Sequence, residues 1–206
     1  MPVVPPEARM RRHTAPARHY ADARPDVCDL DVIAWEGRGA ISSAIRAVTG
    51  GTVTHVGLAC WWGDALMVIE SREFRGGRAV LLSTQVPTHG VLWLRARQPM
   101  PQLDAARAWA LGATGAGYSY RGVLRFLRRL GFPTTPPAGD RSDRGARFCS
   151  ELVSAAYRLG GIDLRPDLTD ATTSPADVVA SPALEVLGRL MPTRAPTDDP
   201  PAAPAA

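Results

Sequence analysis

The stretch TVTHVGLACWWGDALMVIES, residues 52–71, decides the predicted fold. It contains two apolar runs separated by Gly63-Asp64, a pair typical of a tight hairpin turn. We therefore expect two antiparallel strands, over residues 54–62 and 65–71. A turn centred on this pair makes the numbers of facing residues sum to 127, so that Gly57 faces Glu70.

This register predicts that a histidine and a carboxylate meet. Side chains alternate between the faces of a strand, so His55, Gly57, Glu70 and Arg72 share one face. His55 and Glu70 are then diagonal neighbours, about 7–8 Å apart at the backbone, with no side chain on Gly57 between them. A shift of one residue in the register would place them on opposite faces.

The rest of the chain predicts an α+β domain. Apolar runs indicate further strands, and helical spacing of apolar residues indicates helices. The expected strands lie at 30–35, 78–84, 90–97 and the end of 174–187, and the expected helices at 40–51, 102–113, 120–131, 148–161 and the start of 174–187. Strands that precede most of the helices favour α+β over a parallel doubly wound sheet.

The two ends of the chain differ from its middle. Ten of the nineteen prolines lie in residues 1–25 and 192–206, together with few large apolar residues. Such a composition favours disorder. We therefore expect a disordered basic tail over 1–26, one domain over 27–191, and a disordered Pro/Ala-rich tail over 192–206.

Composition excludes several classes of protein. No apolar run approaches the roughly 20 residues of a membrane-spanning helix, and the first residues lack the apolar segment of a secretion signal. We therefore expect no transmembrane segment and a cytoplasmic location. The net charge of +4 comes mostly from arginines near the N-terminus, so no nucleic-acid surface is expected. The oligomeric state is left open.

The three cysteines, Cys28, Cys60 and Cys149, are too few and too scattered for a disulfide framework or a zinc site. We expect reduced thiols, no metal and no cofactor. Cys60 falls on the face opposite His55 and is expected in the core. Cys28 has no functional explanation.

Cys149 stands at the start of the predicted helix 148–161. Unpaired N–H groups and the positive end of the helix dipole favour a thiolate there. The backbone N–H groups of Cys149 and Ser150 can also stabilise an oxyanion. A thiolate nucleophile needs an imidazole and an orienting group, which His55 and Glu70 supply. Each of the three residues also has a purely structural explanation: Cys149 as a small core residue, His55 as the end of a strand and Glu70 as a solvated charge.

The same motifs resemble a known family. TVTHVGLAC (52–60), MVIES (67–71), RFCSELVSAAYRLGG (147–161) and SPADVVASPALEVL (174–187) resemble, in this order, the motifs of circularly permuted papain-fold cysteine hydrolases. The resemblance is to the YiiX-like branch of the NlpC-like superfamily, which is related to the lecithin:retinol acyltransferase-like enzymes. It extends over about residues 27–187.

The resemblance implies a permuted papain-like fold, in which a Cys-bearing helix packs on a curved antiparallel sheet. It implies Cys149 as nucleophile, His55 as base and Glu70 as orienting acid. The family's Tyr-Asp pair after a glycine turn is Tyr118-Ser119 here, so the role of that aspartate is missing.

The expected activity is hydrolysis of an amide or peptide bond, with cell-wall peptide as the preferred substrate class by resemblance. The alternatives are acyl transfer from, or ester cleavage of, an acyl-lipid by the same residues, and a non-catalytic binding domain. Trp61, on the His55 face of its strand, and Tyr118 are expected to line a substrate groove.

Overall fold

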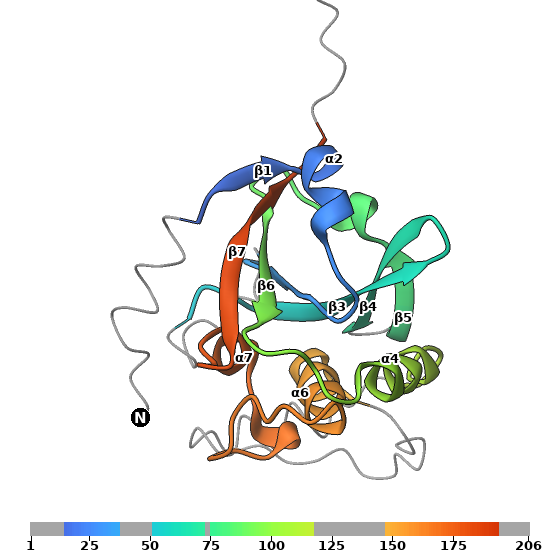
Figure 1. Ribbon diagram of the computed structural model, residues 1–206, viewed down its shortest axis with the longest axis vertical. Helices are drawn as coiled ribbons and strands as arrows, with labels where there is room; N and C mark the ends of the chain where they lie inside the picture. Colours follow the sequence, from blue (N-terminus) through green and yellow to red (C-terminus); the bar gives the residue numbers. More distant parts are fainter. Residues whose placement is uncertain (1–14, 38–50, 73–74, 118–146, 194–206) are drawn as a thin grey trace, which may run out of the picture.

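The computed structural model describes residues 15–37, 51–72, 75–117 and 147–193 (Figure 1). These parts contain seven strands, four helices and three 3-10 turns. The strands are β1 (Ala17–His19), β2 (Val32–Trp35), β3 (His55–Trp62), β4 (Ala65–Arg72), β5 (Gly76–Leu81), β6 (Val91–Ala96) and β7 (Leu184–Met191). The helices are α2 (Tyr20–Ala23), α4 (Leu103–Gly112), α6 (Cys149–Leu159) and α7 (Pro175–Val179), with 3-10 turns η1 (Arg24–Asp26), η2 (Leu82–Gln85) and η3 (Asp170–Thr172).

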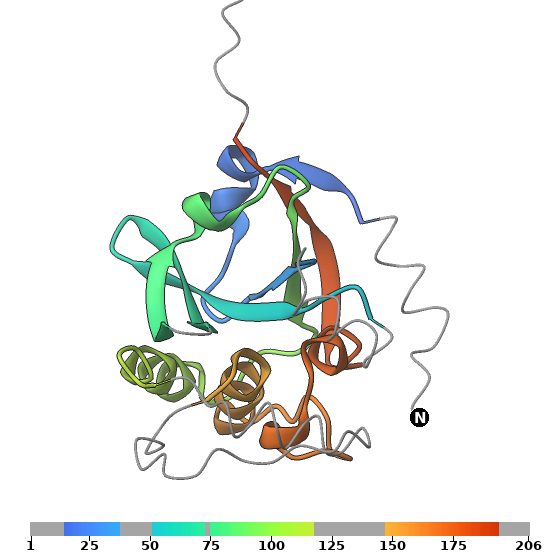
Figure 2. The ribbon, with the colours of Figure 1, turned by 180° about the vertical axis from the view of Figure 1, so that it is seen from behind.

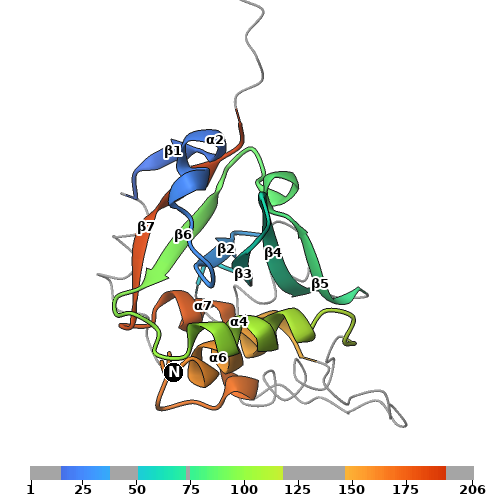
Figure 3. The ribbon, with the colours of Figure 1, turned by 45° about the vertical axis from the view of Figure 1, so that its right-hand side comes forward.

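The strands form one open sheet in the order β1-β7-β6-β2-β3-β4-β5. All neighbours are antiparallel except β1 and β7, which are parallel. The sheet is strongly curved, and Figure 2 shows the same curvature from behind. Helices α4, α6 and α7 gather on one side of it in all three ribbon views (Figure 3). The mixed α+β class is therefore confirmed.

Apolar side chains fill both faces of the sheet. In β2, Val32 and Ala34 belong to the cluster beneath α4, α6 and α7, whereas Ile33 and Trp35 belong to a second cluster on the other face. This is the alternation expected of a strand whose two faces are both buried. It explains why the strands appear in the sequence as nearly continuous apolar runs.

The folded part begins earlier than the sequence predicted. Residues 17–26, expected within the disordered tail, form β1, α2 and η1. Tyr20 and Ala23 are buried in the second apolar cluster, and Ala17 pairs with Arg189 of β7. A three-residue strand that pairs with the far end of the chain leaves almost no local signal, because its partner is distant in sequence.

The other predicted elements match in part. The strands at 30–35, 54–62, 65–71 and 90–97 and the helices at 102–113 and 148–161 all correspond to observed elements. The strand expected over 78–84 ends at Leu81 and continues as η2. The helices expected over 40–51 and 120–131 lie outside the described residues. In the described ranges, no helix has the length and apolar character needed to cross a membrane.

Candidate active site

Strands β3 and β4 pair in the predicted register. Leu58 pairs with Ile69 and Trp62 with Ala65, so the facing residue numbers sum to 127. As expected from this register, the side chains of His55 and Glu70 meet, and 2.5 Å separates His55 Nε2 from Glu70 Oε2. The predicted histidine–carboxylate pair is confirmed as a structural feature.

Gly57 makes this contact possible. A Cβ atom at this position would lie 2.8 Å from Val68 Cγ2, 2.9 Å from the carbonyl oxygen of Ile69 and 3.3 Å from Glu70 Cβ. The carbonyl is part of the backbone and cannot rotate away. A side chain here would therefore push β3 and β4 apart next to Glu70.

Replacing Gly57 with alanine is expected to destabilise the fold by about 1–3 kcal/mol, the usual cost of overpacking. The expected result is a lower Tm in thermal unfolding and slower alkylation of Cys149 at acidic pH. Gly112→Ala is the matched control, because a Cβ atom there would meet nothing within 4 Å apart from its own helix backbone and chain neighbours. Equal Tm values for Gly57→Ala and wild type would contradict the close strand packing.

Glu70 is a completely buried carboxylate with several cationic partners. Its side chain has 0% exposure, and it pairs with Arg78 at 2.5 Å and with Arg72 at 3.3 Å in addition to His55. Burial by itself raises the pKa of Glu70, but hydrogen bonding to His55 and the charges of His55 and Arg72, with the hydrogen bond from Arg78, lower it to about 2. The carboxylate is thus ionised at any physiological pH.

His55 lies between this carboxylate and the thiol. Burial disfavours the charged imidazole, but the Cys149 thiolate and Glu70 outweigh it and raise the pKa of His55 to about 9. Because Nε2 faces Glu70, Nδ1 is the nitrogen left for Cys149. Trp35, its cross-strand partner, covers the ring at a centroid distance of 5.2 Å. Trp35 thereby helps to exclude water from the imidazole.

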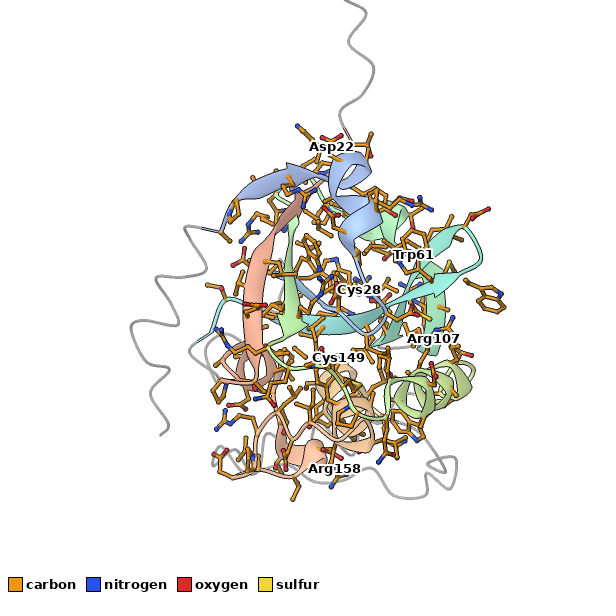
Figure 4. The ribbon with its side chains drawn as sticks, viewed as in Figure 1. Asp22, Cys28, Trp61, Arg107, Cys149 and Arg158 are labelled. Atoms are coloured by element: carbon orange, nitrogen blue, oxygen red, sulfur yellow. The ribbon has the colours of Figure 1, made fainter. Side chains whose placement is uncertain are left out.

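Cys149 is the first residue of α6, which packs beneath β3 (Figure 4). Two contacts position α6: Ser71 Oγ donates to the carbonyl of Arg147, just before the helix, at 2.5 Å, and Tyr157 Oη, in the last turns of the helix, donates to the carbonyl of Leu30 at 2.8 Å. The first fixes the residues before Cys149 beside the end of β4. The second fixes α6 to the residues that lead into β2.

The surroundings of Cys149 favour its thiolate. Burial raises the pKa of the thiol, but the charge and hydrogen bond of His55, with backbone N–H groups of Val56 and Ser150, lower it below its ordinary value. The preceding residue, Phe148, has no side-chain oxygen that could cap the helix. A thiolate–imidazolium pair next to uncapped helix N–H groups can attack a carbonyl and hold the resulting oxyanion.

Trp61, predicted to line a substrate groove, does not lie at this cluster (Figure 4). Trp61 lies six residues from His55 along β3. Its Nε1 donates to the carbonyl of Val27, and the guanidinium carbon of Arg24 lies 4.6 Å from the centroid of its ring. Figure 4 also shows Trp61 well away from Cys149. Tyr118 lies outside the described residues. Cys60 is buried in the core, as expected, and Cys28 is an exposed free thiol.

Three contributors to the cluster were not predicted from the sequence. Trp35 belonged to a recognised strand, but its pairing with His55 requires the β2–β3 register. Arg78 lies directly opposite Glu70 on β5, across a turn that is not a two-residue hairpin. Val56 contributes only its backbone N–H, which no side-chain pattern can reveal.

The fold and the cluster define a mixed α+β protein in which a helix-borne cysteine faces a histidine–carboxylate pair. No family model matches the chain, and no curated protein matches it in sequence. Among solved structures, it is similar to the crystal structure of the metalloprotein YiiX from Escherichia coli O157:H7, DUF1105. The TM-score is 0.58 at 17% identity, over 80% of this chain and 98% of that one. The chain thus has a YiiX-like fold.

Proposed function

We propose that this protein is a cysteine hydrolase that cleaves an amide or peptide bond through an acyl-enzyme. The observation that carries the proposal is the continuous sequence of contacts from Cys149 through His55 to the buried Glu70. These residue types in this order match a nucleophile, a general acid–base group and its orienting acid.

The first half of the reaction acylates Cys149. Its thiolate attacks the carbonyl carbon of the substrate, and the carbonyl oxygen takes the negative charge. The backbone N–H groups of Cys149 and Ser150 are suited to stabilise this oxyanion. The C–N bond then breaks as the His55 imidazolium gives its proton to the leaving nitrogen, which leaves a thioester and a neutral imidazole.

The second half releases the acyl group. Neutral His55 takes a proton from a water molecule, whose oxygen attacks the thioester carbonyl. Collapse of this intermediate expels the Cys149 thiolate, and the acyl group leaves as a carboxylic acid. Glu70 stays ionised throughout and stabilises the imidazolium each time it forms.

We further assign the chain to the circularly permuted papain-like fold of the NlpC-like hydrolases. The support is that the histidine strand precedes the cysteine helix, as in the resembling motifs, and that the sheet and helices are arranged as in YiiX. Cell-wall peptide is the substrate class that the resemblance favours.

The lipid alternative uses the same chemistry, but the tryptophan expected to line a substrate groove does not lie beside the cysteine. Trp61 is remote from Cys149. Incubating the protein with peptide, simple amide and acyl-lipid donors and measuring its intact mass separates the two activities. An acyl adduct on Cys149 from peptide or amide donors supports the proposal. An adduct from acyl-lipids alone would replace it with the lipid activity, and no adduct from any donor would favour a non-catalytic domain.

YiiX is described as a metalloprotein, which raises the question of whether the donors here suit a metal. His55 Nε2 is engaged by Glu70, and the carboxylate of Glu70 is held by two arginines, which repel a cation. In the described segments, no group of three His, Cys, Asp or Glu residues is placed to hold a metal ion. The described residues of the site do not fit a metal, and no step of the reaction is assigned to one.

Removing metals is therefore expected to leave the site unchanged. Dialysis against a chelator should alter neither the rate of Cys149 alkylation nor the turnover of any substrate identified. Measurement before and after dialysis, with re-addition of Zn²⁺ as control, tests this directly. Activity that disappears with the metal and returns with it would overturn the metal-free mechanism.

A further inference from the structure

The buried carboxylate of Glu70 accepts hydrogen bonds at both of its oxygens. Its Oε2 accepts from His55 Nε2 at 2.5 Å. Its Oε1 accepts from two nitrogens of Arg78, Nε at 2.9 Å and Nη2 at 2.5 Å. The Arg78 guanidinium thus holds, with two N–H groups, the oxygen that His55 does not use, and the carboxylate cannot rotate without breaking the hydrogen bonds at Oε1 and Oε2.

The position of Arg78 is itself fixed by the backbone of β5. Gly77 N donates to the carbonyl of Ala116 at 2.8 Å, and Gly115 N donates to the carbonyl of Gly77 at 2.7 Å. A Cβ atom on Gly77 would lie 2.1 Å from the carbonyl oxygen of Ala113. The glycine thus lets the segment after α4 pack directly on β5, one residue before Arg78.

Arg72 is a weaker partner of the same carboxylate. It approaches Oε2 with Nε at 3.3 Å, and its side chain is 42% exposed, against 20% for that of Arg78. Arg72 therefore adds positive charge, whereas Arg78 adds both charge and a fixed geometry.

We propose that Arg78 is a positioning residue, which holds Glu70 so that Oε2 points at His55 and keeps the imidazole directed toward Cys149. The inference rests on the proposed function. The charged groups that face Glu70 in the described structure are His55 from β3, Arg72 from β4 itself and Arg78 from β5, with Cys149 of α6 behind His55. Without Arg78, the carboxylate can rotate and takes up a proton at higher pH, and the thiolate–imidazolium pair weakens.

The test is the rate of iodoacetamide alkylation of Cys149 as a function of pH, which requires no knowledge of the substrate. In Arg78→Met, which keeps a long apolar side chain, the acidic midpoint is expected to rise by about one pH unit, a tenfold loss of thiolate at acidic pH. Arg78→Lys keeps the charge without the two N–H groups of the guanidinium and is expected to recover only part of this loss. Arg75→Met, an exposed arginine before β5, is the matched control and should behave as wild type.

A double-mutant cycle shows whether Arg78 acts through Glu70. In a Glu70→Gln background, Arg78→Met is expected to shift the midpoint by much less than in wild type, since the carboxylate that it positions is gone. Equal shifts in the two backgrounds would mean that Arg78 acts only as a distant charge. That result would overturn the inference.

The other possible results of the alkylation measurements also test the positioning role of Arg78. An Arg78→Met curve that coincides with wild type overturns the role of Arg78, and full recovery by Arg78→Lys overturns the role of the two N–H groups. If Arg78→Met does not fold, judged by thermal unfolding, Arg78→Lys carries the test alone: an unshifted curve overturns the inference. Failure of the proposed function looks different, because then wild-type Cys149 itself lacks reactivity at acidic pH.

Discussion

Cys149→Ser is expected to lose essentially all turnover while it keeps the fold. Serine preserves the size of the side chain, so the packing of α6 beneath β3 is retained. A hydroxyl does not ionise in this site, however, and the nucleophile is lost. Removal of a nucleophile that works as a unit with its base lowers kcat by at least about 10³-fold. The measurement is turnover of the best donor from the mass-spectrometric panel, with Tm as the check of folding.

Cys28→Ser is the matched control for this substitution. Cys28 is an exposed free thiol outside the cluster, so its loss should leave turnover unchanged. Turnover by Cys149→Ser at the wild-type rate would remove Cys149 from the mechanism. Loss of turnover in Cys28→Ser would mean that the wrong cysteine has been assigned.

His55→Ala is expected to lower turnover about 10³-fold or more, because the thiolate loses its counterion and the leaving group loses its proton donor.

The turnover of the wild type is expected to follow a bell-shaped dependence on pH. Turnover rises on the acidic side as Cys149, whose pKa is lowered, becomes a thiolate. It falls on the alkaline side near pH 9, where His55, with its pKa raised to about 9, loses the proton that it must donate.

The control for His55 is His89→Ala, in the turn before β6, which should retain the bell-shaped profile. An alkaline limb that survives the His55→Ala change would show that another group titrates there. An unchanged turnover of His55→Ala across the pH range would refute the assignment of His55 as general acid–base group.

Local sequence signals predicted the histidine–carboxylate pair and the position of the cysteine at a helix start. Gly63-Asp64 fixed the β3–β4 register, and the alternation of side chains then brought His55 and Glu70 together. The glycine between them and the start of α6 at Cys149 were also visible as local patterns. These features depend on short stretches of chain, where turn chemistry and periodicity are informative.

Features that depend on pairing between distant or irregularly joined segments were not predictable. β1 pairs with β7 in parallel at opposite ends of the chain. Arg78 faces Glu70 because β5 pairs with β4. The turn that joins these two strands is not a two-residue hairpin, so its sequence does not predict their register. Trp61 shares the His55 face of β3, but distance along the strand separates the two. A shared face was therefore not enough to place Trp61 in the site.

The most direct test of the proposed site is the rate of iodoacetamide alkylation at each cysteine of the wild-type protein, measured against pH by peptide mass spectrometry. Cys28 is the internal reference, because it is exposed and its pKa is raised by partial burial. We predict that Cys149 reacts rapidly well below the ordinary thiol pKa of about 8.5, and far faster there than Cys28. A Cys149 that reacts no faster than Cys28 at any acidic pH would contradict the thiolate–imidazolium pair and the hydrolase built on it.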